Sequence, residues 1–140
     1  RCIAYKAAVV EEDELDKAGR AVLNLGHTTA HALEVTLGYG RISHGWAVGL
    51  GLLVALVVSE RLLQLDSSLR HRVQAVLDGY GLPTRIAAPP ASELLAAAGR
   101  DKKVVADNMG FVGLSAVGAP VRGLNVPSDV FALALEEIRS

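Results

Sequence analysis

Apolar residues recur at three- and four-residue spacing along much of the chain, which is typical of helices that bury one face. This pattern predicts helices over 27–37, 46–65, 66–77, 92–98 and 127–139. Asp66 or Ser67 is expected to cap the third of these helices and Ser92 the fourth. On the inner face of the helix over 66–77 we place Leu69, Val73, Val76 and Leu77.

The two ends of the chain predict different structures. An acidic cluster at 11–14 favours the start of a helix because acids oppose its positive N-terminal dipole, so we predict a helix from Glu12 to about Asn24. The residues before it fit either a short strand or the tail of a helix. Between Met109 and Val126 apolar residues alternate with small turns, which predicts a β-hairpin. The fold class is therefore mainly α, a multi-helix domain with a small hairpin near the C-terminus.

The most apolar stretch runs from Trp46 to Val58. A membrane-spanning helix needs roughly 18 residues or more, so this shorter stretch predicts a helix buried inside the domain. Within it, Gly49 and Gly51 are expected to permit close helix packing. No charged segment precedes an N-terminal apolar run, so we predict neither a signal peptide nor a membrane partner.

Composition narrows the function classes. The 140 residues form one ordinary domain, and their net charge of −1 without a basic stripe excludes nucleic acid as the default partner. The single cysteine, Cys2, excludes an internal disulfide and a cysteine-based zinc cluster, and it favours a cytoplasmic location. The chain begins at Arg1 without an initiator Met, so we expect it to be a piece of something longer.

Three of the four histidines fall close together in the sequence. His27 and His31 are four residues apart and share one helix face, and His44 follows in a predicted Gly-flanked loop. Inert, hydrogen-bonded histidines remain one interpretation, and a metal site is the other, because neutral imidazole is a common zinc ligand. Zinc proteases of the His-Glu-x-x-His type are excluded because Thr28 follows the first histidine. His71 lies between two arginines and is predicted to be on the surface.

These residues belong to a longer ordered pattern. The chain carries Lys-x-x-Val-Val from Lys6, Arg-x-x-Leu-Asn-x-Gly-His-Thr-x-x-His-Ala-x-Glu from Arg20, and His-Gly-x-Ala-Val from His44. Gly81-Leu82-Pro83 and Asp101-Lys102-Lys103 follow in order. Over nearly its whole length the sequence resembles the C-terminal domain of 3-dehydroquinate synthase, within the sugar-phosphate cyclases.

The resemblance implies an enzyme that cyclises 3-deoxy-arabino-heptulosonate 7-phosphate to 3-dehydroquinate with release of phosphate, using zinc or cobalt and NAD. This step belongs to the shikimate pathway of aromatic amino acid biosynthesis. The resemblance implies that His27 and His44 are metal ligands, and that His31, Lys6 and Asp16 are catalytic residues. It implies substrate binding by Arg20, Asn24, Lys102 and Lys103, without saying which lysine makes the contact.

The resemblance also implies what this chain lacks. The family binds NAD with an N-terminal Rossmann-like domain that donates a glutamate to the metal. We find no Gly-x-Gly-x-x-Gly after a strand, so we expect residues 1–140 to be one metal- and substrate-binding domain, inactive in isolation. We expect its partners to be a small sugar phosphate, the NAD domain and a second copy in a homodimer.

The chain departs from the family pattern at three places, which leave alternatives open. Trp46 stands where an acid or a small residue is more familiar, Asp16 stands where Glu is common, and Thr29-Ala30 replaces the usual aromatic-glycine pair between the histidines. A related sugar-phosphate cyclase with another heptulose phosphate is one alternative. A helical binding module without catalysis is another.

Overall fold

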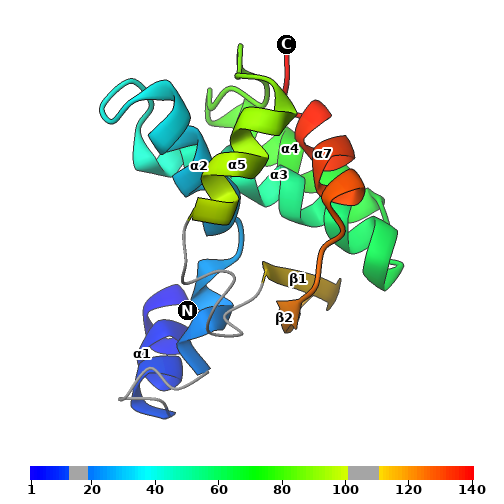
Figure 1. Ribbon diagram of the computed structural model, residues 1–140. Coiled ribbons are helices and arrows are strands. Elements are labelled where there is room, and N and C mark those ends of the chain that lie inside the picture. The colour runs from blue at the N-terminus through cyan, green and yellow to red at the C-terminus, as the bar shows by residue number, and fades with distance from the viewer. Residues whose placement is uncertain (13–18, 101–110) are drawn as a thin grey trace.

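The computed structural model describes residues 1–12, 19–100 and 111–140, and it is mainly helical with one antiparallel hairpin near the C-terminus, as predicted (Figure 1). The elements are α1 (Cys2–Glu12), η1 (Gly19–Asn24), α2 (His27–Leu37), α3 (His44–Leu63), α4 (Ser68–Gly79), α5 (Ala91–Arg100), β1 (Phe111–Ala116), β2 (Ala119–Leu124) and α7 (Ser128–Glu136).

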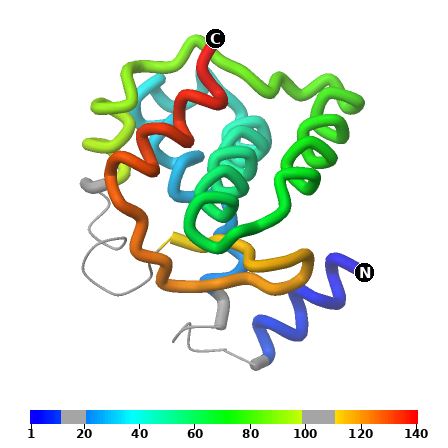
Figure 2. Tube along the Cα trace, turned by 90° about the vertical axis from the view of Figure 1, so that its right-hand side faces the viewer, coloured from blue at the N-terminus to red at the C-terminus, as the bar shows by residue number. Residues whose placement is uncertain are grey.

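Helix α3 forms the centre of the domain. Its Leu, Val and Ala side chains between Ala47 and Val58 are largely buried, in one core with residues of α2, α5 and α7. Figure 2 shows α3 between α4 and α7. Among the described residues, α3 is the one helix long and apolar enough to cross a membrane, but 61% of its apolar window is buried inside the domain. The predicted burial of this apolar stretch is therefore confirmed.

The start of α3 differs from the prediction. His44 is the first residue of the helix rather than part of a loop, because Ser43 acts as the N-cap. The Ser43 side-chain oxygen accepts a hydrogen bond from the Trp46 backbone N–H at 3.3 Å, which satisfies one of the free amides of the first turn. The other end comes at Leu63, where Gln64 adopts a left-handed conformation with φ 56°.

Two further predictions on the outer helices are wrong in detail. Val76 of α4 is 57% exposed, so the buried face of α4 is narrower than predicted. Helix α5 begins at Ala91, and Ser92 lies inside it instead of capping it. The backbone N–H groups of Glu93 and Leu94 donate to the Pro90 carbonyl, so the helix starts before the serine rather than after it.

The N-terminal part resolves one alternative and corrects one prediction. Residues 2–12 are the helix α1, not a strand. The helix predicted from Glu12 to Asn24 ends in the 3-10 helix η1, which is a common connector between helices, and residues 13–18 lie outside the described part. Gly26, with φ 82°, then turns the chain into α2, whose bounds match the prediction.

A buried serine hydrogen-bonds the hairpin to α3, in addition to the apolar contacts of Phe111 with the core. The Ser59 hydroxyl of α3 donates to the Ala55 carbonyl at 2.7 Å and accepts the Leu114 N–H of β1 at 2.9 Å. Gly113 lies tightly beside it, because a Cβ there would be 3.0 Å from the Ser59 side-chain oxygen, closer than most Cβ contacts. This contact orients the hairpin, which turns at Gly118 with φ +81°.

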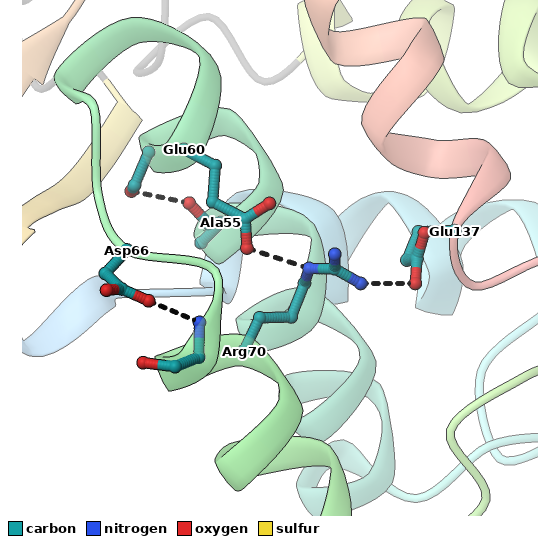
Figure 3. A network of polar contacts seen from close by, with 7 residues as sticks. Ala55, Glu60, Asp66, Arg70 and Glu137 are labelled. Carbon is teal, nitrogen blue, oxygen red and sulfur yellow. Dashed lines mark hydrogen bonds and ion pairs between the residues drawn. The ribbon is translucent and has the colours of Figure 1, made fainter.

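A charged network links α3, α4 and the end of α7. The Arg70 guanidinium donates to Glu60 at 2.8 Å and to Glu137 at 2.6 Å, as Figure 3 shows. Arg70 is only 15% exposed in its side chain, so these charge-assisted bonds are partly shielded from water. Arg70 therefore ties α3 and α4 to the end of α7, which lies 67 residues further along the chain.

The predicted glycine packing is confirmed and is very tight at one position. A Cβ built on Gly51 would lie 2.0 Å from the Gly26 carbonyl oxygen. A Cβ on Gly49 would only touch the terminal methyls of Leu77, at 3.4 and 3.8 Å. Backbone therefore packs directly on backbone where α3 passes the start of α2.

Candidate functional site

Three of the side chains predicted to form the site come together at the junction of α2 and α3. The ring centroids of His27 and His44 are 5.4 Å apart, and His31 lies 6.0 Å from His27 and 6.2 Å from His44. His27, His31 and Glu34 stand at helical spacing on one stripe of α2, and α3 starts against that stripe. The packing of α2 on α3 thus gathers histidines that are separated in sequence.

His27 is held by the chain just before its helix. Its Nδ1 lies 3.3 Å from the Leu25 carbonyl oxygen. A carbonyl oxygen only accepts hydrogen bonds, so in the neutral imidazole this contact places the proton on Nδ1 and leaves the lone pair on Nε2. A half-buried imidazole in this state presents Nε2 as a donor atom for a metal.

His44 makes the corresponding contact to a carboxylate. Its Nδ1 lies 3.0 Å from Glu34 Oε1. A histidine that binds a metal through one nitrogen typically donates its other N–H to a carboxylate or a backbone carbonyl. The chemistry of the donor set at His27 and His44 therefore fits a metal such as zinc.

The described residues do not supply a complete metal site. Within 1–12, 19–100 and 111–140, no group of three or more His, Cys, Asp or Glu side chains is arranged to hold a metal ion. Catalytic zinc usually has three protein ligands and one open position. If His27 and His44 are two of the ligands, a third protein ligand is not found beside them among the described side chains.

The structure says less about the other predicted site residues. Asn24 is exposed at the end of η1, just before Gly26 and His27. Lys6 is exposed on α1, which packs beside η1, and no described contact joins it to the histidines. Arg20 lies in η1, but its side chain is outside the described ones. The predicted roles of Asp16, Lys102 and Lys103 fall on positions outside the described residues.

Trp46, which departs from the family pattern, is a structural anchor. It packs against the core, and its Nε1 donates to the Pro83 carbonyl at 2.9 Å. This bond attaches the Gly81-Leu82-Pro83 segment to the first turn of α3, close to His44.

Glu34 and the Leu25 carbonyl are two contacts of the cluster that were not among the predicted site residues. Glu34 carries a usable signal, because it continues the stripe of His27 and His31 at seven residues from His27. The Leu25 contact is made by the backbone, so side-chain patterns do not reveal it.

The described chain is thus a mainly helical domain in which imidazoles gather where two helices begin. The family model "3-dehydroquinate synthase C-terminal" matches residues 1–104. The chain therefore belongs to the 3-dehydroquinate synthase family, and it corresponds to the C-terminal part of the family's members.

Curated relatives agree with that assignment. The chain is 42% identical to a 3-dehydroquinate synthase of Opitutus terrae over 99% of this chain and 39% of the relative. It is 37% identical to one of Acidithiobacillus ferrooxidans, over 94% of this chain and 36% of the relative. It is 38% identical to a 3-dehydroquinate synthase of Shewanella pealeana, over 100% of this chain and 38% of the relative. The chain thus spans less than two-fifths of the length of these relatives.

Proposed function

We propose that this chain is the metal- and substrate-binding domain of an enzyme that cyclises 3-deoxy-arabino-heptulosonate 7-phosphate to 3-dehydroquinate and releases phosphate. The observation that carries the proposal is the histidine cluster, in which His27 and His44 each have Nδ1 engaged and Nε2 left as a donor. Family membership supports the choice of reaction, because the curated relatives cited above are named for it.

His27 and His44 would hold the metal, which we propose to be zinc, with cobalt as a substitute. Bound there, the metal would lower the pKa of a substrate hydroxyl and so ease hydride loss to NAD. We propose that NAD and the remaining metal ligand belong to an N-terminal Rossmann-like domain. The absence of a group of three metal-binding side chains in the described residues supports a shared site of this kind.

The other residues would act on the substrate directly. His31 is exposed beside the other two histidines, where an imidazole is able to accept and return a proton near neutral pH. Lys6 and Asp16 are the further catalytic candidates. Arg20, Asn24 and one of Lys102 and Lys103 would bind the carboxylate, phosphate and hydroxyls, since a guanidinium is a forked donor suited to such anions. We also propose a cytoplasmic homodimer.

The test is metal analysis with NAD-dependent phosphate release by the protein in its natural length. His27→Ala and His44→Ala should each abolish both metal content and phosphate release. Arg20→Ala should weaken substrate binding far more than metal binding. Stoichiometric zinc in both histidine variants would contradict the metal assignment. Faster turnover of a different heptulose phosphate would contradict the proposed substrate.

A further inference from the structure

The side chain of Glu34 lies against a predicted metal ligand instead of pointing into solvent. It projects from the last turns of α2 and contacts His44, the first residue of α3, with 3.0 Å between Oε1 and Nδ1. The Glu34 side chain is 14% exposed, whereas that of His44 is 54% exposed. The imidazole is thus open to solvent on one side and held by a largely covered carboxylate on the other.

In the neutral imidazole, this contact selects which ring nitrogen carries the proton. An ionised carboxylate only accepts hydrogen bonds, so the proton of the contact is on Nδ1 of His44. Nε2 is then the nitrogen with the lone pair, as it is in His27. Without Glu34, an exposed imidazole at a helix start is free to adopt either tautomer and other rotamers.

We propose that Glu34 is a positioning residue that keeps the His44 ring in the tautomer and orientation needed for metal binding, and that Glu34 is not itself a ligand. The inference rests on the proposed function for the role of His44. Two observations favour positioning over ligation. Glu34 Oε1 is already engaged by Nδ1. In addition, the described His and Glu side chains form no three-membered group able to hold a metal.

The experiment compares Glu34→Ala with Glu34→Gln in the protein of natural length. Zinc affinity is measured by competition with a chromophoric chelator, and the His44 tautomer by ¹⁵N NMR of the metal-free protein. Loss of such a partner typically costs about 10- to 100-fold in metal affinity, which is the loss expected for Glu34→Ala. Glu34→Gln keeps the oxygen acceptor and the side-chain volume, so it should stay within a few-fold of the unmodified protein. Glu93→Ala, an exposed glutamate on α5, is the matched control and should change neither readout.

Each outcome is decisive. If Glu34→Gln loses as much affinity as Glu34→Ala, the carboxylate is a ligand and the proposal is wrong. If Glu34→Ala keeps both the affinity and the Nδ1–H tautomer, Glu34 positions nothing. If the unmodified protein binds no zinc, or His44→Ala leaves affinity intact, the proposed function fails instead, while the metal-free NMR comparison still tests the contact between Glu34 and His44.

Discussion

Gly51 offers the sharpest test of how the core helix positions the histidines. A Cβ at Gly51 would lie 2.0 Å from the Gly26 carbonyl oxygen and 2.9 Å from its carbonyl carbon, whereas real Cβ atoms essentially never approach within 3.0 Å. The obstacle is backbone, so no side-chain rotation relieves it, and α3 would have to withdraw from Gly26 by about 1 Å. Overpacking of this kind costs about 1–3 kcal/mol or more.

The neighbouring Gly49 is the matched control. Its added Cβ would be 3.4 Å from a terminal methyl of Leu77, which is ordinary contact with the end of a flexible side chain. Alanine is favoured over glycine inside a helix by about 1 kcal/mol. Gly49→Ala should therefore be neutral or stabilising, although it makes the same chemical change two residues away on the same helix.

Thermal and urea unfolding, followed by circular dichroism, measure both variants. We expect Gly51→Ala to lower the free energy of unfolding by about 2 kcal/mol, which corresponds to roughly 6 °C in Tm for a domain of this size. Because Gly26 directly precedes His27, zinc affinity should fall in Gly51→Ala and stay unchanged in Gly49→Ala. Equal stability of the two variants, or a greater loss in Gly49→Ala, would refute the reasoning.

Three further predictions follow from the polar contacts. Arg70→Ala leaves two partly buried glutamates without their cation and should cost roughly 2 kcal/mol in urea unfolding, while the exposed neighbour variant Arg72→Ala should be near neutral. Ser59→Ala removes the acceptor of a β1 backbone N–H and should cost about 1–3 kcal/mol by the same assay, with faster hydrogen exchange at that amide. Hydrogen bonds from Ser68 hold the pKa of Asp66 below 3.8, so the carboxylate favours the folded state above that value and loses this effect as the pH falls through its lowered pKa. NMR titration should show that low pKa, and Ser68→Ala should raise it; an unchanged pKa would show that the Ser68 side chain has no part in it.

Long, strongly periodic segments were predictable from the sequence, and helix starts were less so. The bounds of α2 follow from the glycines on either side of it, and the existence of the hairpin follows from the alternation of apolar residues with small turns. The start of α3 was misjudged because glycines next to His44 suggested a loop, whereas one side-chain bond from Ser43 is enough to begin the helix there. Val76 was misjudged because periodicity identifies the apolar face of a helix, but it does not show how much of that face the neighbouring elements cover.

The candidate site was predictable in its residue types and only partly in its geometry. The spacing of His27 and His31 places them on one helix face, but the approach of His44 depends on how α3 crosses α2. That crossing depends on the bare backbone contact of Gly26 with Gly51, which no side-chain pattern reveals. The sequence pattern therefore identified the three histidines, and the packing of two glycines explains why they meet.

Two contacts together account for the arrangement of the cluster. Gly26, before the start of α2, packs on Gly51 of α3, and Glu34, near the end of α2, bonds His44 at the start of α3. The order of these partners means that the two helices run past each other in opposite directions, with a close contact at each end of the shared stretch. His27 and His31 lie on α2 between those contacts. We therefore expect the separation of the imidazoles to depend on one contact that needs the absence of a side chain at Gly51 and on one in which Glu34 accepts a hydrogen bond from His44. Loosening either end should weaken metal binding at the proposed site while leaving the histidines themselves unchanged.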